Sequence, residues 1–155
     1  MMADHTPRPP SLLAHPSYVA SQVSKHGRRH LEAALREQGL LLGHVAILRA
    51  LDDFGPLSQQ QLAGSLDFDK SHLVVRIDEM ASQGLVTRTQ DPSDRRRNQI
   101  ALTPAGQAVA DQMQPVALES HRGFLDALSA AEQKTLMSLL RRVLAANDAD
   151  RQRER

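Results

Sequence analysis

The chain has 155 residues, of which 41% are hydrophobic and 24% are charged, and its formal net charge is +1. This composition is typical of a single globular domain with a hydrophobic core, and a near-neutral charge does not by itself indicate a nucleic-acid partner. The absence of cysteine excludes disulfides, thiolate metal sites and redox sensing through thiols.

The N-terminal third of the chain predicts an arm followed by two helices. Residues 1–16 contain four prolines and show no hydrophobic period, which predicts a flexible arm. Residues 17–38 carry apolar side chains along one side, which predicts a long amphipathic helix that ends at Gly39. Residues 40–53 are apolar on several sides, so we expect a second helix at the centre of the domain.

Two short helices joined by a tight connection are predicted next. Ser58 followed three residues later by Gln61 forms a capping box, which starts the first of them. Asp69 is the predicted N-cap of the second helix, and Gly84 supplies its left-handed C-terminal stop. The second helix has an apolar stripe at spacings of four and three residues: Leu73, Ile77 and Met80. This order is that of a helix-turn-helix.

The hydrophobic period changes to two after Gly84, which predicts a β-hairpin. Its tip consists of turn-forming residues 91–94 followed by Arg95, Arg96 and Arg97. Guanidinium groups bind phosphates and enter narrow minor grooves, so three adjacent arginines at a hairpin tip indicate a nucleic-acid contact.

Two long helices are predicted after the hairpin. Thr103 caps the first, which has Pro104 at its first position and runs to about Leu128 with a kink at Pro115. The second begins with a capping box formed by Ser129 and Glu132. Alternating charges over residues 148–155 predict a frayed tail. Long apolar-striped helices without a partner in their own chain imply a second subunit.

The segments SHLVVRIDEMASQGLV and DPSDRRRNQIALTPAG resemble the recognition helix and wing of the MarR family of bacterial transcriptional regulators. The family pattern, Asp-x-x-Asp-Arg-Arg, five residues and Leu-Thr-x-x-Gly, is matched by these residues: Asp91, Asp94, Arg95, Arg96, Leu102, Thr103 and Gly106. The resemblance implies a mainly α fold with a small β-hairpin wing. It implies one domain over residues 17–147, with dimerisation helices at 17–38 and 104–147 and a winged helix-turn-helix lobe at 40–103.

The resemblance further implies a sequence-specific DNA-binding regulator, a homodimeric repressor that is released by a small organic effector and needs no cofactor. Its two recognition helices would lie in successive major grooves of a pseudo-palindromic operator, with the wings on flanking minor grooves. Ten side chains are candidate DNA contacts: Ser58, Gln59, Lys70, Ser71, His72, Val75, Arg76, Arg95, Arg96 and Arg97.

Val75 and Asp78 lie near the centre of the predicted outward face of the recognition helix. Many MarR relatives carry an arginine where Val75 stands, which puts the usual guanine contact in question. Val75 either packs on a neighbouring element or contacts thymine methyl groups in the major groove, and both interpretations stay open. Asp78 resembles the family aspartate that pairs with a wing arginine.

The histidines suggest two further sites. His30, His44 and Leu48 are candidate effector contacts in the pocket that the resemblance implies, although a hydrogen-bonded core histidine is an equal interpretation of His44. His26 and His30, four residues apart, place two imidazoles on one helix face, and His44 or His121 would complete a metal site. Neighbouring positive charge and the lack of a carboxylate cluster disfavour it, so we predict no metal.

Other function classes remain as alternatives. The sequence has no nucleophile elbow, phosphate loop, dinucleotide fingerprint or zinc-protease motif, so we do not expect an enzyme. Residues 57–106 carry six positive and six negative side chains, so DNA binding would depend on where the positive charges lie. A winged-helix module that contacts only proteins is therefore one alternative. A metal-responsive regulator of the same fold is another. With no apolar run that spans a membrane and no signal peptide, we expect a cytoplasmic protein that does not bind membranes.

Overall fold

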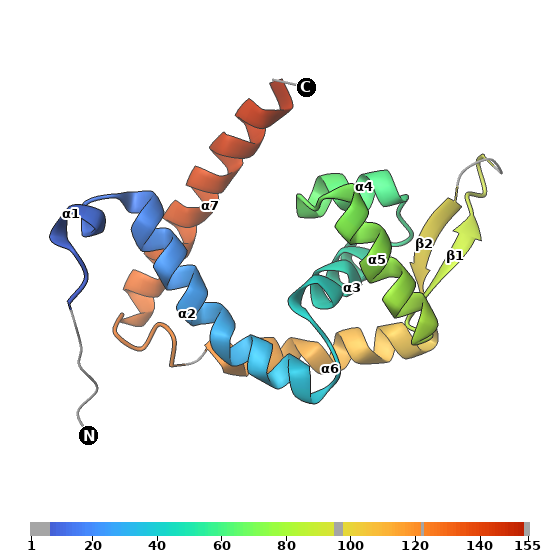
Figure 1. The fold of residues 1–155 in the computed structure, drawn as a ribbon, viewed down its shortest axis with the longest axis horizontal. Coiled ribbons are helices and arrows are strands. Elements are labelled where there is room, and N and C mark those ends of the chain that lie inside the picture. Colours follow the sequence, from blue (N-terminus) through green and yellow to red (C-terminus); the bar gives the residue numbers. More distant parts are fainter. Residues whose placement is uncertain (1–6, 95–97, 122, 154–155) are drawn as a thin grey trace. The chain divides into compact units, whose positions relative to one another are not determined.

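The computed structural model describes residues 7–94, 98–121 and 123–153, which form seven helices and one antiparallel strand pair (Figure 1). The chain divides into two compact units, residues 1–120 and residues 121–155. The predicted fold class, a mainly helical winged helix-turn-helix with a small β-hairpin, is confirmed by the order of these elements.

Helices α1 (Pro10–Leu13) and α2 (Pro16–Glu37) each begin with a proline, which fits the first helical turn because the N–H there needs no partner within the helix. The sequence predicts a flexible arm over residues 1–16, and within this range Pro10 starts a single helical turn at residues 10–13. Helix α2 ends close to its predicted boundary, and Gly39 follows it with a φ of +68°.

Helix α3 (Leu42–Phe54) lies in the middle of the first unit, as its apolar sequence predicts (Figure 1). Ile47 and Leu48 have no exposed surface. Fully buried side chains from the surrounding elements complete the core: Leu35, Leu62, Leu73, Ile77, Met80, Ile100 and Met113. Because α3 packs against both later helices of the lobe, their positions are set by one continuous apolar cluster.

Helices α4 (Gln59–Leu66) and α5 (Lys70–Ser82) form the predicted helix-turn-helix. The capping box at α4 is confirmed, since the backbone N–H of Gln61 donates to Ser58 Oγ at 3.2 Å and the backbone N–H of Ser58 donates to Gln61 Oε1 at 2.9 Å. Asp67 turns the chain between the helices in a left-handed conformation with a φ of 53°. Gly84 ends α5 with a φ of +71°, as predicted.

Strands β1 (Val86–Gln90) and β2 (Asn98–Leu102) form the predicted hairpin, with Val86 opposite Leu102 and Gln90 opposite Asn98. The arginines of its tip, residues 95–97, lie outside the described residues. Leu57 extends the pairing, because its N–H donates to the Ile100 oxygen at 3.0 Å and its oxygen accepts from the Ile100 N–H at 2.7 Å. The wing is therefore attached to the connection between α3 and α4.

A tight corner joins the wing to α6 (Pro104–His121). Thr103 caps the helix as predicted, because the backbone N–H of Gly106 donates to its Oγ1 at 3.0 Å, and this hydroxyl donates to the Gly84 oxygen at 2.6 Å. A Cβ on Gly106 would lie only 1.9 Å from the Leu85 oxygen. The Leu-Thr-x-x-Gly motif thus fastens the first turn of α6 to the end of α5, and its last position has room for glycine alone.

The end of α6 corrects a predicted boundary. The sequence predicts a helix to about Leu128, but α6 ends at His121, with Pro115 inside it. Gly123 has a φ of +71°, a conformation that glycine adopts without strain, and its N–H donates to Asp126 Oδ1 at 3.2 Å. A left-handed backbone at this glycine cannot continue a right-handed α-helix, so the predicted helix is interrupted here.

Helix α7 (Ala130–Arg153) makes up most of the second unit. Its predicted capping box is confirmed, since the N–H of Ser129 donates to Glu132 Oε2 at 2.8 Å. The sequence predicts a frayed tail over residues 148–155, and α7 extends into this range as far as Arg153, which pairs with Asp150 one turn earlier at 3.4 Å. Among the helices of the described residues, none is both long and apolar enough to cross a membrane.

Candidate nucleic-acid interface

The N-terminus of α5 is fixed by the side chain of Asp69. Its Oδ1 accepts from the backbone N–H of Ser71 at 2.8 Å and from that of His72 at 3.3 Å, and it also accepts from the Ser71 hydroxyl. These bonds, above all the one from the Ser71 hydroxyl, hold the pKa of Asp69 below its usual value. Lys70, Ser71 and His72 are all exposed in this first turn, so three of the predicted contacts share one end of the helix.

The predicted outward face of α5 is the face that the structure exposes. Ser71, Val75, Asp78 and Ser82 are exposed, whereas the apolar stripe on the other side is buried. Val75 is 53% exposed, and Val74 beside it is 41% exposed. The helix therefore presents two adjacent valines and the polar residues around them on a single face.

The wing is tied to this face by an ion pair between Arg88 of β1 and Asp78 of α5. The prediction that Asp78 pairs with a wing arginine is confirmed. Sequence reasoning did not include Arg88 among the candidate contacts. At the start of the tip, Asp91 Oδ1 accepts from the Ser93 N–H at 2.8 Å, which forms a local turn. The three arginines that follow, residues 95–97, lie outside the described residues.

A hollow lies between the N-terminal ends of α4 and α5 on the same unit. The side chains that line it come from both helices: Gln59, Gln60, Lys70, Leu73 and Val74. Gln59 and Lys70, two of the predicted contacts, therefore share one depression. Ser58 stands beside it as the cap of α4, where its hydroxyl oxygen already accepts a bond from Gln61.

Arg76 is only partly exposed, unlike the other predicted contacts on α5, although it lines a hollow together with His72. Its Nη1 donates to Glu79 Oε2 at 2.8 Å, and its side chain is 34% exposed. A Cβ built on Gly43 would lie 3.6 Å from Arg76 Nε, so this arginine packs across the first turn of α3. The reason is helical position, since residue 76 follows Leu73 by three and so lies beside the buried stripe.

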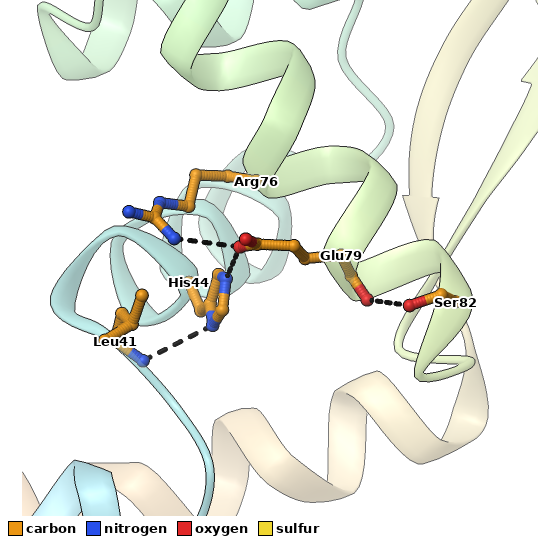
Figure 2. A network of polar contacts seen from close by, with 5 residues as sticks. All are labelled: Leu41, His44, Arg76, Glu79 and Ser82. Carbon is orange, nitrogen blue, oxygen red and sulfur yellow. Dashed lines mark hydrogen bonds and ion pairs between the residues drawn. The ribbon is translucent and has the colours of Figure 1, made fainter.

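Glu79 links Arg76 to a buried histidine, as Figure 2 shows. His44 is 3% exposed, and its Nε2 lies 2.8 Å from Glu79 Oε2. Its Nδ1 accepts from the Leu41 N–H at 3.3 Å, so in the neutral ring the proton resides on Nε2 and is donated to Glu79. The bonds from His44 and then Arg76 hold the pKa of Glu79 below its usual value.

The candidate effector residues have different surroundings. His44 has the hydrogen-bonded core geometry that was one of its two interpretations. Leu48 has no exposed surface, and His30 is exposed on α2. His26 Nε2 lies 3.3 Å from a guanidinium nitrogen of Arg8. In the described part of the chain, no three histidine, aspartate or glutamate side chains are grouped so that they could hold a metal ion.

Of the hollows that adjoin the His44–Glu79–Arg76 network within the first unit, two are lined by both Arg36 of α2 and Leu41 before α3. One is lined by α2, the start of α3 and α5: Glu32, Arg36, Leu40, Leu41, Leu42, Gly43 and Arg76. The other is lined by residues of α2, the α2–α3 connection, α3 and the C-terminal end of α5: Arg36, Gly39, Leu40, Leu41, His44, Glu79 and Gln83. Sequence reasoning missed Arg36 here, because its proximity to α5 depends on how the chain folds back after Gly39.

Two capped helices, an exposed outer face on the second and a wing paired to that helix define a winged helix-turn-helix protein. The MarR family model matches residues 40–97, which contain α3, α4, α5 and β1. A putative transcriptional regulatory protein for the hcr operon of Thauera aromatica is 31% identical over 133 residues, which cover 81% of this chain and 80% of that protein. The chain belongs to the MarR family, and it is a transcriptional regulator.

Solved structures share this fold. CouR from Rhodococcus jostii, bound to p-coumaroyl-CoA, is similar with a TM-score of 0.79 and 25% identity, covering 90% of this chain and 96% of that one. A mutant of MarR from E. coli, complexed with operator DNA, is similar with a TM-score of 0.75 and 25% identity, covering 83% of this chain and 92% of that one.

Proposed function

We propose that the protein is a homodimeric repressor that binds a pseudo-palindromic operator in double-stranded DNA and leaves it when a small organic effector binds. Helix α5 of each protomer would enter a major groove, and each wing would reach the neighbouring minor groove. The observation that carries the proposal is the exposed outer face of α5, with the wing held beside it by Asp78 and Arg88. The protein would act in the cytoplasm and without catalysis.

The proposed DNA contacts come from three places. They are Ser58 and Gln59 at the start of α4, Lys70, Ser71, His72 and Val75 of α5, and Arg95, Arg96 and Arg97 of the wing. MarR of E. coli, complexed with operator DNA, supports this use of the fold. For Arg76 we propose a positioning role, because it packs on α3 and pairs with Glu79.

The placement of charge supports DNA binding by a nearly neutral chain. The carboxylates near the outer face have partners within the chain: Asp69 accepts from two amides of α5, and Asp78 pairs with Arg88. Lys70 adds a positive charge at the N-terminal end of α5. Phosphate contacts by such groups make affinity fall steeply as salt rises.

The second unit supports a dimer. Helix α7 leaves a series of large apolar side chains exposed: Met137, Leu139, Leu140, Val143 and Leu144. Apolar surface of this extent on one helix is usually buried against another chain. A dimer would also supply the second recognition helix that a pseudo-palindromic operator requires.

The hollows beside α3 support an effector site. Arg36 and Arg76 line one of them together with leucines, a combination that suits an organic acid with an apolar body. His44, one of the predicted effector contacts, lines the other. CouR bound to p-coumaroyl-CoA supports an organic effector in this family. An effector lowers DNA affinity only to the extent that it prefers the form that does not bind DNA.

The salt dependence of DNA binding tests the wing in this proposal. Replacing Arg95 and Arg96 by alanine should weaken binding to all duplexes and reduce the slope of log affinity against log salt by about one for each phosphate that the wing no longer neutralises. The control variant replaces Arg28 and Arg29, two adjacent exposed arginines of α2, and changes the net charge equally. A slope that changes as much in the control as in the wing variant would remove the wing from the proposal.

The effector is tested on the protein–DNA complex. Titration with aromatic and aliphatic carboxylic acids should release the labelled duplex for at least one class of acid. Affinity that no acid changes would indicate a constitutive repressor, and release by zinc alone would favour the metal-responsive alternative. A protein that ignores DNA at moderate salt would instead be a winged-helix module for protein contacts.

A further inference from the structure

The outer face of α5 offers few polar groups for reading base edges, because most of them are bonded within the chain. The Ser71 hydroxyl donates to Asp69, and Asp78 accepts from Arg88. Ser82 Oγ donates to a backbone oxygen of its own helix at 2.7 Å. Direct readout by hydrogen bonds would require several of these bonds to break.

The centre of the same face is apolar. Val75 is 53% exposed, and Val74, which is 41% exposed, borders the hollow that contains Gln59 and Lys70. In the major groove, the apolar group that distinguishes one base from the others is the 5-methyl group of thymine. A valine in the middle of a DNA-facing helix has the chemistry to contact that group and no hydrogen-bonding atom with which to read guanine.

We propose that Val75 is a specificity-determining residue that selects thymine in each half-site through its 5-methyl group. This inference rests on the proposed function, in which α5 lies in the major groove. The β-branched side chain of valine has one strongly preferred rotamer in a helix, so its methyl groups are already positioned for contact. Lys70 and His72, one turn earlier, contact phosphates and set the register in which Val75 meets the base.

The test begins by selecting duplexes that bind the full-length protein from a random pool, at about physiological salt. The tightest duplex is the probe, and each of its thymines is replaced singly by uracil, which lacks only the 5-methyl group. Burial of one methyl group corresponds to about fourfold in affinity. We expect one thymine in each half-site to show about this loss, and about 15-fold when both are replaced, since independent sites combine multiplicatively.

Two variants assign the effect to one side chain. In Val75→Ala the preference for thymine over uracil at that position should disappear. Val74→Ala is the matched control, because it removes the same two carbons one residue away and should leave the preference unchanged. Alanine has a higher helix propensity than valine, so both variants keep α5 helical.

The outcomes separate this inference from the proposal it rests on. A selected duplex in which no uracil lowers affinity, or a preference that persists in Val75→Ala, would overturn the role of Val75 and leave DNA binding in place. A preference that depends on Val74 instead would also overturn it. If no duplex is enriched over the starting pool, both the inference and the proposed DNA binding fail.

Discussion

Gly106 is the position where one added methyl group should do most damage. In Gly106→Ala the new Cβ would lie 1.9 Å from the Leu85 oxygen and 2.9 Å from the Leu85 carbonyl carbon. Both are backbone atoms, so no side-chain rotation relieves the contact and the start of α6 must move away. That movement also lengthens the bond from the Thr103 N–H to the Leu85 oxygen, now 3.1 Å.

The magnitude follows from these two effects. Overpacking in a closely packed region costs about 2 kcal/mol, and the loss of a backbone hydrogen bond adds about 1 kcal/mol. We therefore expect Gly106→Ala to reduce the free energy of unfolding by about 3 kcal/mol. For a domain of this size, this corresponds to a melting temperature lower by about 6–12 °C.

Gly64→Ala is the matched control. Gly64 lies inside α4, and nothing is within 4 Å of a Cβ built there. The same substitution should raise the free energy of unfolding by about 0.5–1 kcal/mol, because alanine is the better helix former. Both variants are unfolded in urea at one fixed protein concentration, since the stability of a dimer depends on concentration. A Gly106→Ala variant within about 0.5 kcal/mol of the parent chain would refute the proposed corner.

Three further substitutions test other contacts. Asp78→Asn should weaken DNA binding, because Arg88 loses the partner that holds the wing beside α5. The free energy of unfolding should change by less than about 1 kcal/mol, since the pair is exposed. DNA affinity that is unchanged in anisotropy titrations would contradict this expectation. The bonds that lower the pKa of Glu79 stabilise the folded state above about pH 4.5, and this contribution is lost as the pH falls through the lower folded pKa. In Glu79→Gln, melting temperatures should accordingly depend less on pH below 4.5, and an equally steep dependence would argue against the bonds that Glu79 accepts from His44 and Arg76. Val75→Arg should shift the preferred base pair toward guanine in a random-pool selection, and an unchanged preference would contradict the placement of residue 75.

Local features of the fold were predictable because their signals lie within a few residues. Ser58 and Gln61 cap α4 at a spacing that any capping box has, and Gly84 ends α5 where the apolar stripe stops. Asp78 was assigned to a wing arginine by resemblance, and the structure supplies Arg88 as that partner. The hydrophobic period also placed α3 at the centre of the lobe.

Features that depend on long-range contacts or competing local forces were not predictable. The bond between His44 and Glu79 joins residues 35 positions apart, and it exists only because α3 and α5 pack together. Arg76 is a predicted DNA contact, and its packing against the first turn of α3 likewise depends on how α3 and α5 pack together. The turn at Gly123 interrupts a stretch with helical period, since the glycine adopts a left-handed conformation.

The central claim, sequence-specific DNA binding, is tested most directly by fluorescence anisotropy. The labelled duplex is the DNA upstream of the protein's own gene, and an unlabelled, unrelated duplex is the competitor, at about physiological salt. We predict binding that survives an excess of the competitor and weakens as salt rises. Equal affinity for the labelled duplex and the competitor would contradict the claim, provided that the tightest duplex from a random pool also binds no better than the competitor.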